Sequence, residues 1–310
     1  MERDLSSRAL LNTLDETLEM LRAHVGADAE PAAPAEPLPS LLEQCEAACD
    51  AIPAPQPLRS IHHFACTGGT VMSKALFALP NTVVLSEIDP LSTAMLATGD
   101  KLPFAPTDLV AALRHSVRPV EDEVIVATFL EGLTAAKAGL EAGGRQLILR
   151  DHAHSQFCRD SVDFDTRPTL REMVADRFET RAVLTMRHPL DSFLSLMVNK
   201  WVQFTPGTLE EYARRYLAFL DRHEGVPVLF YEDFTVDPGA VLRRMCDYLD
   251  LTFSPLAADL IGAVRMSGDS GRSDAKIGPR PRRAVPEEIE AQRGESPEYR
   301  ALCGRFGYAP

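Results

Sequence analysis

Apolar positions after residue 57 alternate between short continuous runs and longer stretches with helical spacing. Five short runs predict strands, at 60–65, 82–85, 146–150, 182–186 and 226–231. Helical spacing predicts helices near 70–79, 121–142, 190–200 and 238–249. Strands that alternate with helices indicate a parallel sheet covered on both faces. We therefore expect an α/β domain with a central parallel sheet, whose ligands bind beyond the carboxyl ends of the strands.

Residues 1–57 have a different pattern. Apolar residues recur at intervals of three and four over 1–26, which predicts a helix, and 41–52 fits a second one. The Pro/Ala-rich stretch 27–39 between them is typical of a linker. We expect a helical extension with its linker at 1–57, followed by the α/β domain at 58–310.

The composition is that of an acidic globular protein. The chain has 310 residues, 45% hydrophobic and 25% charged, which is enough for one large domain. No run approaches the roughly 18 consecutive apolar residues of a membrane span, and residues 1–11 lack the apolar core of a signal peptide. We therefore expect a cytoplasmic protein. The formal net charge of −13 argues against a nucleic-acid polymer as partner.

Cysteine and histidine spacing does not indicate a metal site. Cys45 and Cys49 lie one helical turn apart, but no second Cys or His pair follows at a spacing typical of zinc ligands. The six cysteines are expected to be small buried residues in a reducing compartment. His62 and His63 are neighbours in a predicted strand, so one points to each face and at least one is structural. We expect no bound metal.

A basic segment interrupts the acidic chain between residues 271 and 283. It is either a solvated loop or a segment that binds a small, highly charged anion. Its basic residues are Arg272, Lys276, Arg280, Arg282 and Arg283.

The first predicted strand is followed by Cys-Thr-Gly-Gly-Thr at 66–70, where a helix begins. Glycines let the backbone approach an anion, and the helix amino terminus directs N–H donors and a positive dipole end toward it. The turn lacks the GxxxxGKS/T pattern of nucleoside triphosphatases, and Lys74 lies one turn into the helix instead. A plain tight turn is the alternative interpretation.

The fourth predicted strand is followed by Arg-His-Pro-Leu-Asp-Ser-Phe-Leu-Ser at 187–195. Arg187 stands at the strand tip, Pro189 suits the first turn of a helix, and Ser195 falls about two turns along it. An arginine and a serine placed in this way can share one phosphate. The alternative is a surface arginine and a serine that faces solvent.

Four segments together resemble the sulfotransferases that use 3′-phosphoadenosine 5′-phosphosulfate (PAPS), and they occur in that family's order between about 58 and 285. They are ACTGGT (65–70), similar to the 5′-phosphosulfate loop; RHPLDSFLS (187–195), similar to the 3′-phosphate motif; YEDF (231–234), similar to the segment after the fifth strand; and SGDSGRSDAKIGPRPRR (267–283), similar to the loop that covers the donor.

The resemblance implies a P-loop-like three-layer fold with a central parallel sheet, PAPS as donor and no metal. It implies that the 5′-phosphosulfate is cradled by Thr67, Gly68, Gly69 and Thr70, that the 3′-phosphate is bound by Arg187 and Ser195, and that the nucleotide is covered by Arg272, Ser273 and Lys276. Many members of the family carry Lys or Arg at the position of Thr67. We expect Lys74 to supply that charge from the helix, as a basic residue does in the tyrosylprotein branch.

Sulfuryl transfer to a hydroxyl needs a base near the acceptor and positive charge near the leaving oxygen. Glu87, at the end of the second predicted strand, is our candidate base, since the tyrosylprotein and heparan branches carry Glu at a similar place. Asp89 could act instead, orient the acceptor or cap the next helix. His152 is a second candidate for the base. His152 and His154 are expected to line the acceptor pocket rather than bind a metal, because two histidines without a third ligand are an incomplete ligand set.

The expected activity is sulfuryl transfer from PAPS to an acceptor hydroxyl, on a small molecule, lipid, glycan or natural product that the sequence does not identify. Two alternatives stay open. One is a kinase with a P-loop type of fold, although the turn lacks its Lys followed by Ser or Thr. The other is a nucleotide-binding protein without catalysis. The oligomeric state is also undetermined.

Overall fold

The computed structural model describes residues 15–20, 23, 40–44, 55–92, 108–118, 120–266 and 277–310. The chain divides into two compact units, Met1–Pro55 and Gln56–Pro310. In the first unit, the described residues 15–20 and 41–44 are helical. The site discussed below belongs entirely to the second unit. Within the described part of the chain, no helix is both long and apolar enough to cross a membrane.

A five-stranded parallel sheet forms the centre of the second unit, in the order β2-β3-β1-β4-β5. The strands are β1 (Leu58–His63), β2 (Thr82–Ile88), β3 (Gln146–Asp151), β4 (Thr180–Met186) and β5 (Val228–Phe230). This confirms the predicted α/β fold class. The boundaries differ by a few residues, and β5 is shorter than predicted because a helix already begins at Tyr231.

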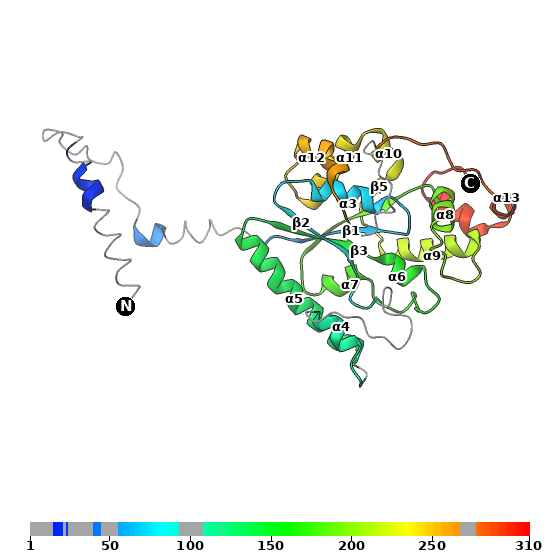
Figure 1. Ribbon diagram of the computed structural model, residues 1–310, viewed down its shortest axis with the longest axis horizontal. Helices are drawn as coiled ribbons and strands as arrows, with labels where there is room; N and C mark the ends of the chain where they lie inside the picture. The colour runs from blue at the N-terminus through cyan, green and yellow to red at the C-terminus, as the bar shows by residue number, and fades with distance from the viewer. Residues whose placement is uncertain are drawn as a thin grey trace. The chain divides into compact units, whose positions relative to one another are not determined.

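Helices cover both faces of this sheet, with α3, α11 and α12 on one face and α5, α7 and α9 on the other (Figure 1). The helices on and around the first face are α3 (Gly69–Phe77), α10 (Tyr231–Val236), α11 (Pro238–Leu249), α12 (Pro255–Leu260) and the short η1 (Ile261–Ala263). The remaining helices are α4 (Leu109–Arg114), α5 (Asp122–Ala142), α6 (Ala153–Phe157), α7 (Leu170–Ala175), α8 (Pro189–Val198), α9 (Leu209–Arg222), α13 (Glu287–Glu295) and α14 (Pro297–Arg305).

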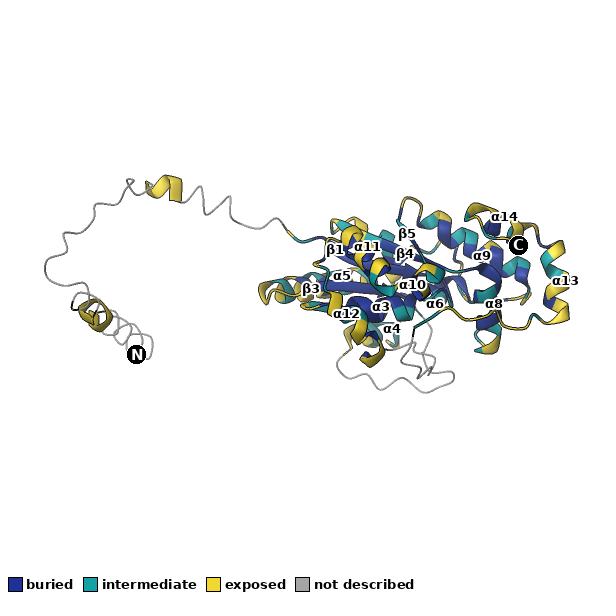
Figure 2. Ribbon diagram, turned by 90° about the horizontal axis from the view of Figure 1, so that it is seen from above, coloured by how far each residue is buried: buried dark blue, intermediate teal, exposed yellow. Residues whose placement is uncertain are grey.

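Apolar burial on both sides keeps the central strands in the core, as the dark strands of Figure 2 show. Alternate residues of a strand face opposite sides. Ile61 of β1 and Ile148 of β3 accordingly pack in the cluster that contains α3 and α11. Leu58 and Leu149 pack in a separate cluster with residues of α5 and α7. This continuous burial explains why the strands appear as apolar runs without alternation.

Helix α9 is absent from our sequence prediction and fills much of the second face. Thr208 caps it by accepting from the Glu211 amide, and its apolar positions recur at helical spacing. Tyr212, Tyr216 and Phe219 of this helix are fully buried against Phe64, which stacks on Tyr216 with ring centroids 4.4 Å apart.

The connections of the sheet reverse direction between β1 and β4, which is where the general rule for open α/β sheets places the ligand crevice. From β1 the chain passes through α3 to β2 on one side, whereas from β4 it passes through α8 and α9 to β5 on the other. Loops that leave neighbouring strands in opposite directions open a crevice at the carboxyl ends of those strands. The two segments that we predicted to bind phosphate are the loops at the ends of β1 and β4.

Candidate functional site

The turn after β1 has the backbone shape of an anion cradle. Cys66 has φ +64° and Gly68 has φ +92°, and both values lie in the left-handed region. A Cβ added to Gly68 would lie 2.4 Å from the Tyr231 ring, and one added to Gly69 would lie 2.2 Å from the His63 ring. Among the described residues, no side chain caps the amino terminus of α3, so its dipole end faces the turn.

Thr67 turns its side chain into the protein. The residue is fully buried, and its hydroxyl donates to the Phe64 carbonyl at 2.8 Å and lies 2.9 Å from the Thr185 hydroxyl of β4. This side chain therefore ties the turn to the neighbouring strand. Any contact of Thr67 with a donor would come from its backbone.

The predicted arginine–serine pair forms beside this turn. Nη1 of Arg187 donates to Oγ of Ser195 at 3.2 Å and to the carbonyl oxygen of Cys66 at 3.3 Å. The guanidinium also lies over the Tyr231 ring, 4.9 Å from its centroid. Ser195 is buried in α8, two turns after Pro189 at the start of that helix. The crevice between β1 and β4 thus gathers residues of both predicted phosphate-binding segments.

A second layer of contacts holds the Arg187 segment in place. The amide of His188 donates to one carboxylate oxygen of Glu232 at 2.9 Å, and the hydroxyl of Tyr308 donates to the other at 3.0 Å. Arg282, from the basic segment, donates to Asp191 at 2.9 Å. The YEDF segment and the end of the chain therefore support the motif at 187–195.

Arg150 of β3 is a buried residue of the site that our sequence analysis missed. It donates to the Thr70 hydroxyl and the Ser86 hydroxyl, both at 2.8 Å, and to Nε2 of His63 at 3.1 Å. Burial lowers the pKa of Arg150, and burial together with the Arg150 charge lowers the pKa of His63 well below its usual value. His63 is therefore neutral and accepts from Arg150. An arginine inside the apolar run before Asp151 was the available signal.

Glu87 lies next to Arg150, at the end of β2. Its carboxylate is 3.5 Å from Nη1 of Arg150, and its side chain is 27% exposed. Glu87 has φ +58°, and the pairing of β2 with β3 shifts register between Leu85 and Ile88. Such irregularities re-aim a side chain and are typical of functional sites. The structure brings Glu87 and the α3 turn together through their common contact with Arg150.

Lys74 is buried on α3, four residues after Thr70 and so on the same face of the helix. Thr70 itself is held by Arg150. Lys74 thus belongs to the side of α3 that carries the Arg150 contact.

The other acceptor-site candidates have structural partners. Asp89 is ion-paired with Arg167, accepts from the Ser155 hydroxyl and accepts from the Leu91 amide at 3.1 Å, so its carboxylate is engaged on several sides. His154 donates from Nε2 to the Trp201 carbonyl at 3.2 Å.

His152 and His154 lie directly beyond β3, with ring centroids 6.3 Å apart. Burial, with a smaller contribution from the His152 charge, lowers the pKa of His154 to about 4, so this imidazole is neutral. His152 is half-buried at the start of α6 and follows the end of β3, the strand next to β2, which carries Glu87.

The proposed donor-covering residues Arg272, Ser273 and Lys276 lie outside the described residues, as do Cys45 and Cys49. The described part of the basic segment begins at Ile277 and includes Arg282 with its Asp191 contact.

Comparison with known proteins finds likeness in solved structures only. No family model and no curated protein matches the chain. The chain is similar to the sulfotransferase domain of the Synechococcus PCC 7002 olefin synthase, with 18% identity, a TM-score of 0.47, and coverage of 84% of this chain and 98% of that one. It is also similar to a sulfotransferase from Alicyclobacillus acidocaldarius, with 13% identity, a TM-score of 0.43, and coverage of 83% and 98%.

A mouse sulfotransferase solved in complex with PAP is similar at 10% identity and a TM-score of 0.42, and the match covers 84% of this chain and 92% of that one. These three solved structures are sulfotransferases, the family that the four sequence segments resemble.

Proposed function

We propose that this protein is a sulfotransferase that moves the sulfuryl group of PAPS to an acceptor hydroxyl. The observation that carries the proposal is the pairing of Arg187 with Ser195 beside the glycine turn of β1, in the crevice between β1 and β4. A donor with phosphate groups at the 3′ and 5′ positions of its ribose would bind both the Arg187–Ser195 pair and the glycine turn. An adenosine that carries phosphate groups at its 3′ and 5′ positions fits two such anion sites.

In this proposal, the 3′-phosphate binds Arg187 and Ser195, and the 5′-phosphosulfate lies over the turn at Gly68 and Gly69. Support for the second part comes from the uncapped α3 terminus and from the lack of space for a Cβ at either glycine. Thr67 contributes its backbone, because its hydroxyl is bonded inside the protein. Arg272, Ser273 and Lys276 are proposed to cover the donor.

The chemistry follows from where charge is lost and where it develops. The acceptor oxygen forms a new bond to sulfur while the bond from sulfur to the bridging phosphate oxygen breaks, and the 5′-phosphate leaves with the negative charge. Glu87 takes the proton from the acceptor hydroxyl. Thr70, Lys74 and the turn amides stabilise the leaving phosphate, and Arg150 holds Thr70 and Glu87 in position.

A kinase is the second candidate, and the turn disfavours it. Kinases of the P-loop type use a lysine followed by Ser or Thr at the end of the turn, with an Asp to organise magnesium. Here the turn continues from Gly69 into Thr70 and Val71, and the nearest lysine of the helix is Lys74. The acceptor is proposed only as a hydroxyl compound, either a small molecule or a glycan. Its pocket would be lined by Asp89, His152 and His154.

The test of the donor assignment compares two ligands, 3′,5′-adenosine bisphosphate (PAP) and AMP, which lacks the 3′-phosphate. The native protein should prefer PAP. Arg187→Ala should reduce that preference by about ten- to a hundredfold, since it leaves the bound 3′-phosphate without its charged donor. AMP affinity should change little.

Arg177→Ala is the matched control, because Arg177 pairs with Glu131 at 2.8 Å on a solvent-exposed surface. It should leave both affinities as they are. A preference for PAP that survives Arg187→Ala unchanged would show that the 3′-phosphate site lies elsewhere.

A further inference from the structure

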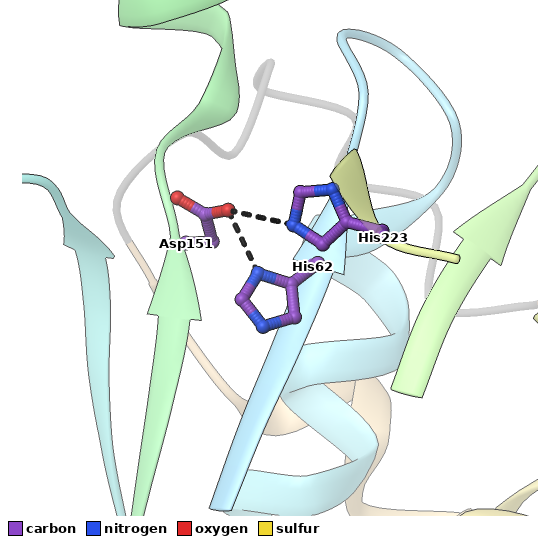
Figure 3. A group of neighbouring side chains, drawn as sticks. All are labelled: His62, Asp151 and His223. Atoms are coloured by element: carbon purple, nitrogen blue, oxygen red, sulfur yellow. Dashed lines mark hydrogen bonds and ion pairs between the residues drawn. The ribbon is translucent and has the colours of Figure 1, made fainter. Parts of the chain in front are cut away.

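Three buried side chains meet on the sheet face opposite the glycine turn. They are His62 of β1, Asp151 of β3 and His223, which follows the end of α9 (Figure 3). Each offers one ligand atom, and the three atoms lie within 4.8 Å of one another. Our sequence analysis connected none of these residues with a metal, since they are far apart along the chain.

The geometry centres on one carboxylate oxygen. Oδ2 of Asp151 lies 2.8 Å from Nδ1 of His62 and 4.0 Å from Nε2 of His223. In Figure 3 the two imidazole rings converge on this oxygen from neighbouring elements. The two histidine side chains are fully buried, and that of Asp151 is 5% exposed.

The outer nitrogens of both rings already have partners. Nδ1 of His223 donates to the Phe219 carbonyl at 2.7 Å, which leaves Nε2 as the lone-pair nitrogen. Nε2 of His62 lies 2.8 Å from the Ser60 hydroxyl. Histidines that ligate metals almost always bond their other nitrogen in this way, since the bond fixes the tautomer and the ring orientation.

Hydrogen bonding within the cluster does not satisfy every member. Nε2 of His223 is buried without a hydrogen-bond partner among the described residues, and it points at a carboxylate 4.0 Å away, beyond hydrogen-bond range. A buried polar atom left in this state costs about 1–3 kcal/mol. A metal ion about 2.0–2.2 Å from each ligand atom would bridge such a gap.

We infer that His62, Asp151 and His223 bind one zinc ion. Two imidazoles and a carboxylate suit zinc, whereas calcium and magnesium prefer oxygen ligands alone. The fourth coordination position would be taken by the second Asp151 oxygen or by water. When Nδ1 of His62 becomes a ligand, its proton moves to Nε2, which then donates to Ser60.

The inferred role is structural. The three ligands join β1, β3 and the end of α9, while the proposed donor contacts come from the turn after β1 and from the segment after β4. His63, the neighbour of His62, faces that other side and contacts Arg150. The zinc ion would therefore hold together the strands that lead into the site, and zinc binding does not depend on the proposed activity.

The experiment uses the full chain without a histidine tag, stripped with a chelator and titrated with Zn²⁺ by calorimetry, with elemental analysis of the loaded protein. We expect one zinc ion per chain and a higher melting temperature. His223→Asn keeps a donor for the Phe219 carbonyl but lacks the ligand nitrogen, and it should lose the site. Ser60→Ala, a small change at a buried strand position, should weaken zinc affinity by about ten- to a hundredfold.

The control is His154→Ala, which removes an imidazole three residues from Asp151 but outside the cluster and should bind zinc as the native chain does. Circular dichroism checks that each variant is folded. If the native chain takes up no stoichiometric zinc, or if Ser60→Ala and a folded His223→Asn bind it unchanged, the inference is wrong. The zinc affinity of Ser60→Ala is measured independently. If His223→Asn fails to fold, the Ser60→Ala result therefore still tests the inference.

Discussion

At the scale of single residues, the site depends on side chains whose orientation is fixed by contacts with neighbouring residues. Glu87 has a positive φ at a register shift of the sheet, and Arg150 faces its carboxylate at 3.5 Å. Backbone strain of this kind costs on the order of 1–3 kcal/mol and persists where the surrounding structure fixes it. Asp89, in contrast, has its carboxylate bonded by three neighbours. The residue with a partly exposed carboxylate is therefore the better candidate base.

Glu87→Gln should lower turnover by on the order of a hundredfold or more, because the amide cannot accept the acceptor's proton. Donor affinity should stay the same, since Glu87 is not among the proposed donor contacts. Steady-state kinetics with a matched acceptor and a separate donor titration measure the two quantities.

His152→Ala provides the comparison for Glu87→Gln. A small effect of His152→Ala on turnover, beside a large effect of Glu87→Gln, assigns the base to Glu87. If the two results are reversed, His152 is the base and Glu87 only orients the acceptor.

At the scale of elements, the turn from β1 into α3 depends on its two glycines. Gly69 lies so close to the His63 ring that a methyl group would overlap it, and Gly68 combines a positive φ with the same kind of contact to Tyr231. The tight approach lets the α3 terminus reach the crevice. Helix α5 contrasts with this turn, because its Gly132 and Gly139 have no atom within 4 Å of an added Cβ.

Gly69→Ala should destabilise the protein by about 1–3 kcal/mol, since the added methyl group forces the His63 ring to move. It should also weaken donor binding. Gly139→Ala in the exposed part of α5 should stabilise the protein by roughly 0.5–1 kcal/mol, because alanine favours a helix interior. Denaturant unfolding measures both changes. A Gly69→Ala protein with native stability and native donor affinity would contradict the role given to the turn.

Sequence patterns predict the elements better than the contacts between them. The strands follow from apolar runs, and the places of Arg187 and Ser195 follow from helical spacing after a strand end. Arg150 was missed because the residues next to it in the sequence do not reveal its partners. Those partners come from β1, β2 and α3. The inward turn of the Thr67 hydroxyl depends on Thr185, a residue far along the chain.

At the scale of the whole second unit, residues from both ends of its sequence meet at the crevice. Tyr308 and Glu232 support the segment of Arg187, and His188 donates to the Ala309 carbonyl at 3.0 Å. The strand order brings the loops after β1 and β4 together, although they are more than a hundred residues apart in the chain. The crevice is therefore a property of the folded unit, and the nature of its ligand is the central claim.

The most direct measurement is a calorimetric titration with 3′,5′-adenosine bisphosphate in the absence of magnesium, with ATP and ADP titrated in parallel. The account predicts tight binding of the bisphosphate that requires its 3′-phosphate and needs no magnesium. Binding of ATP alone, and only when magnesium is present, would contradict the sulfotransferase proposal and favour a kinase.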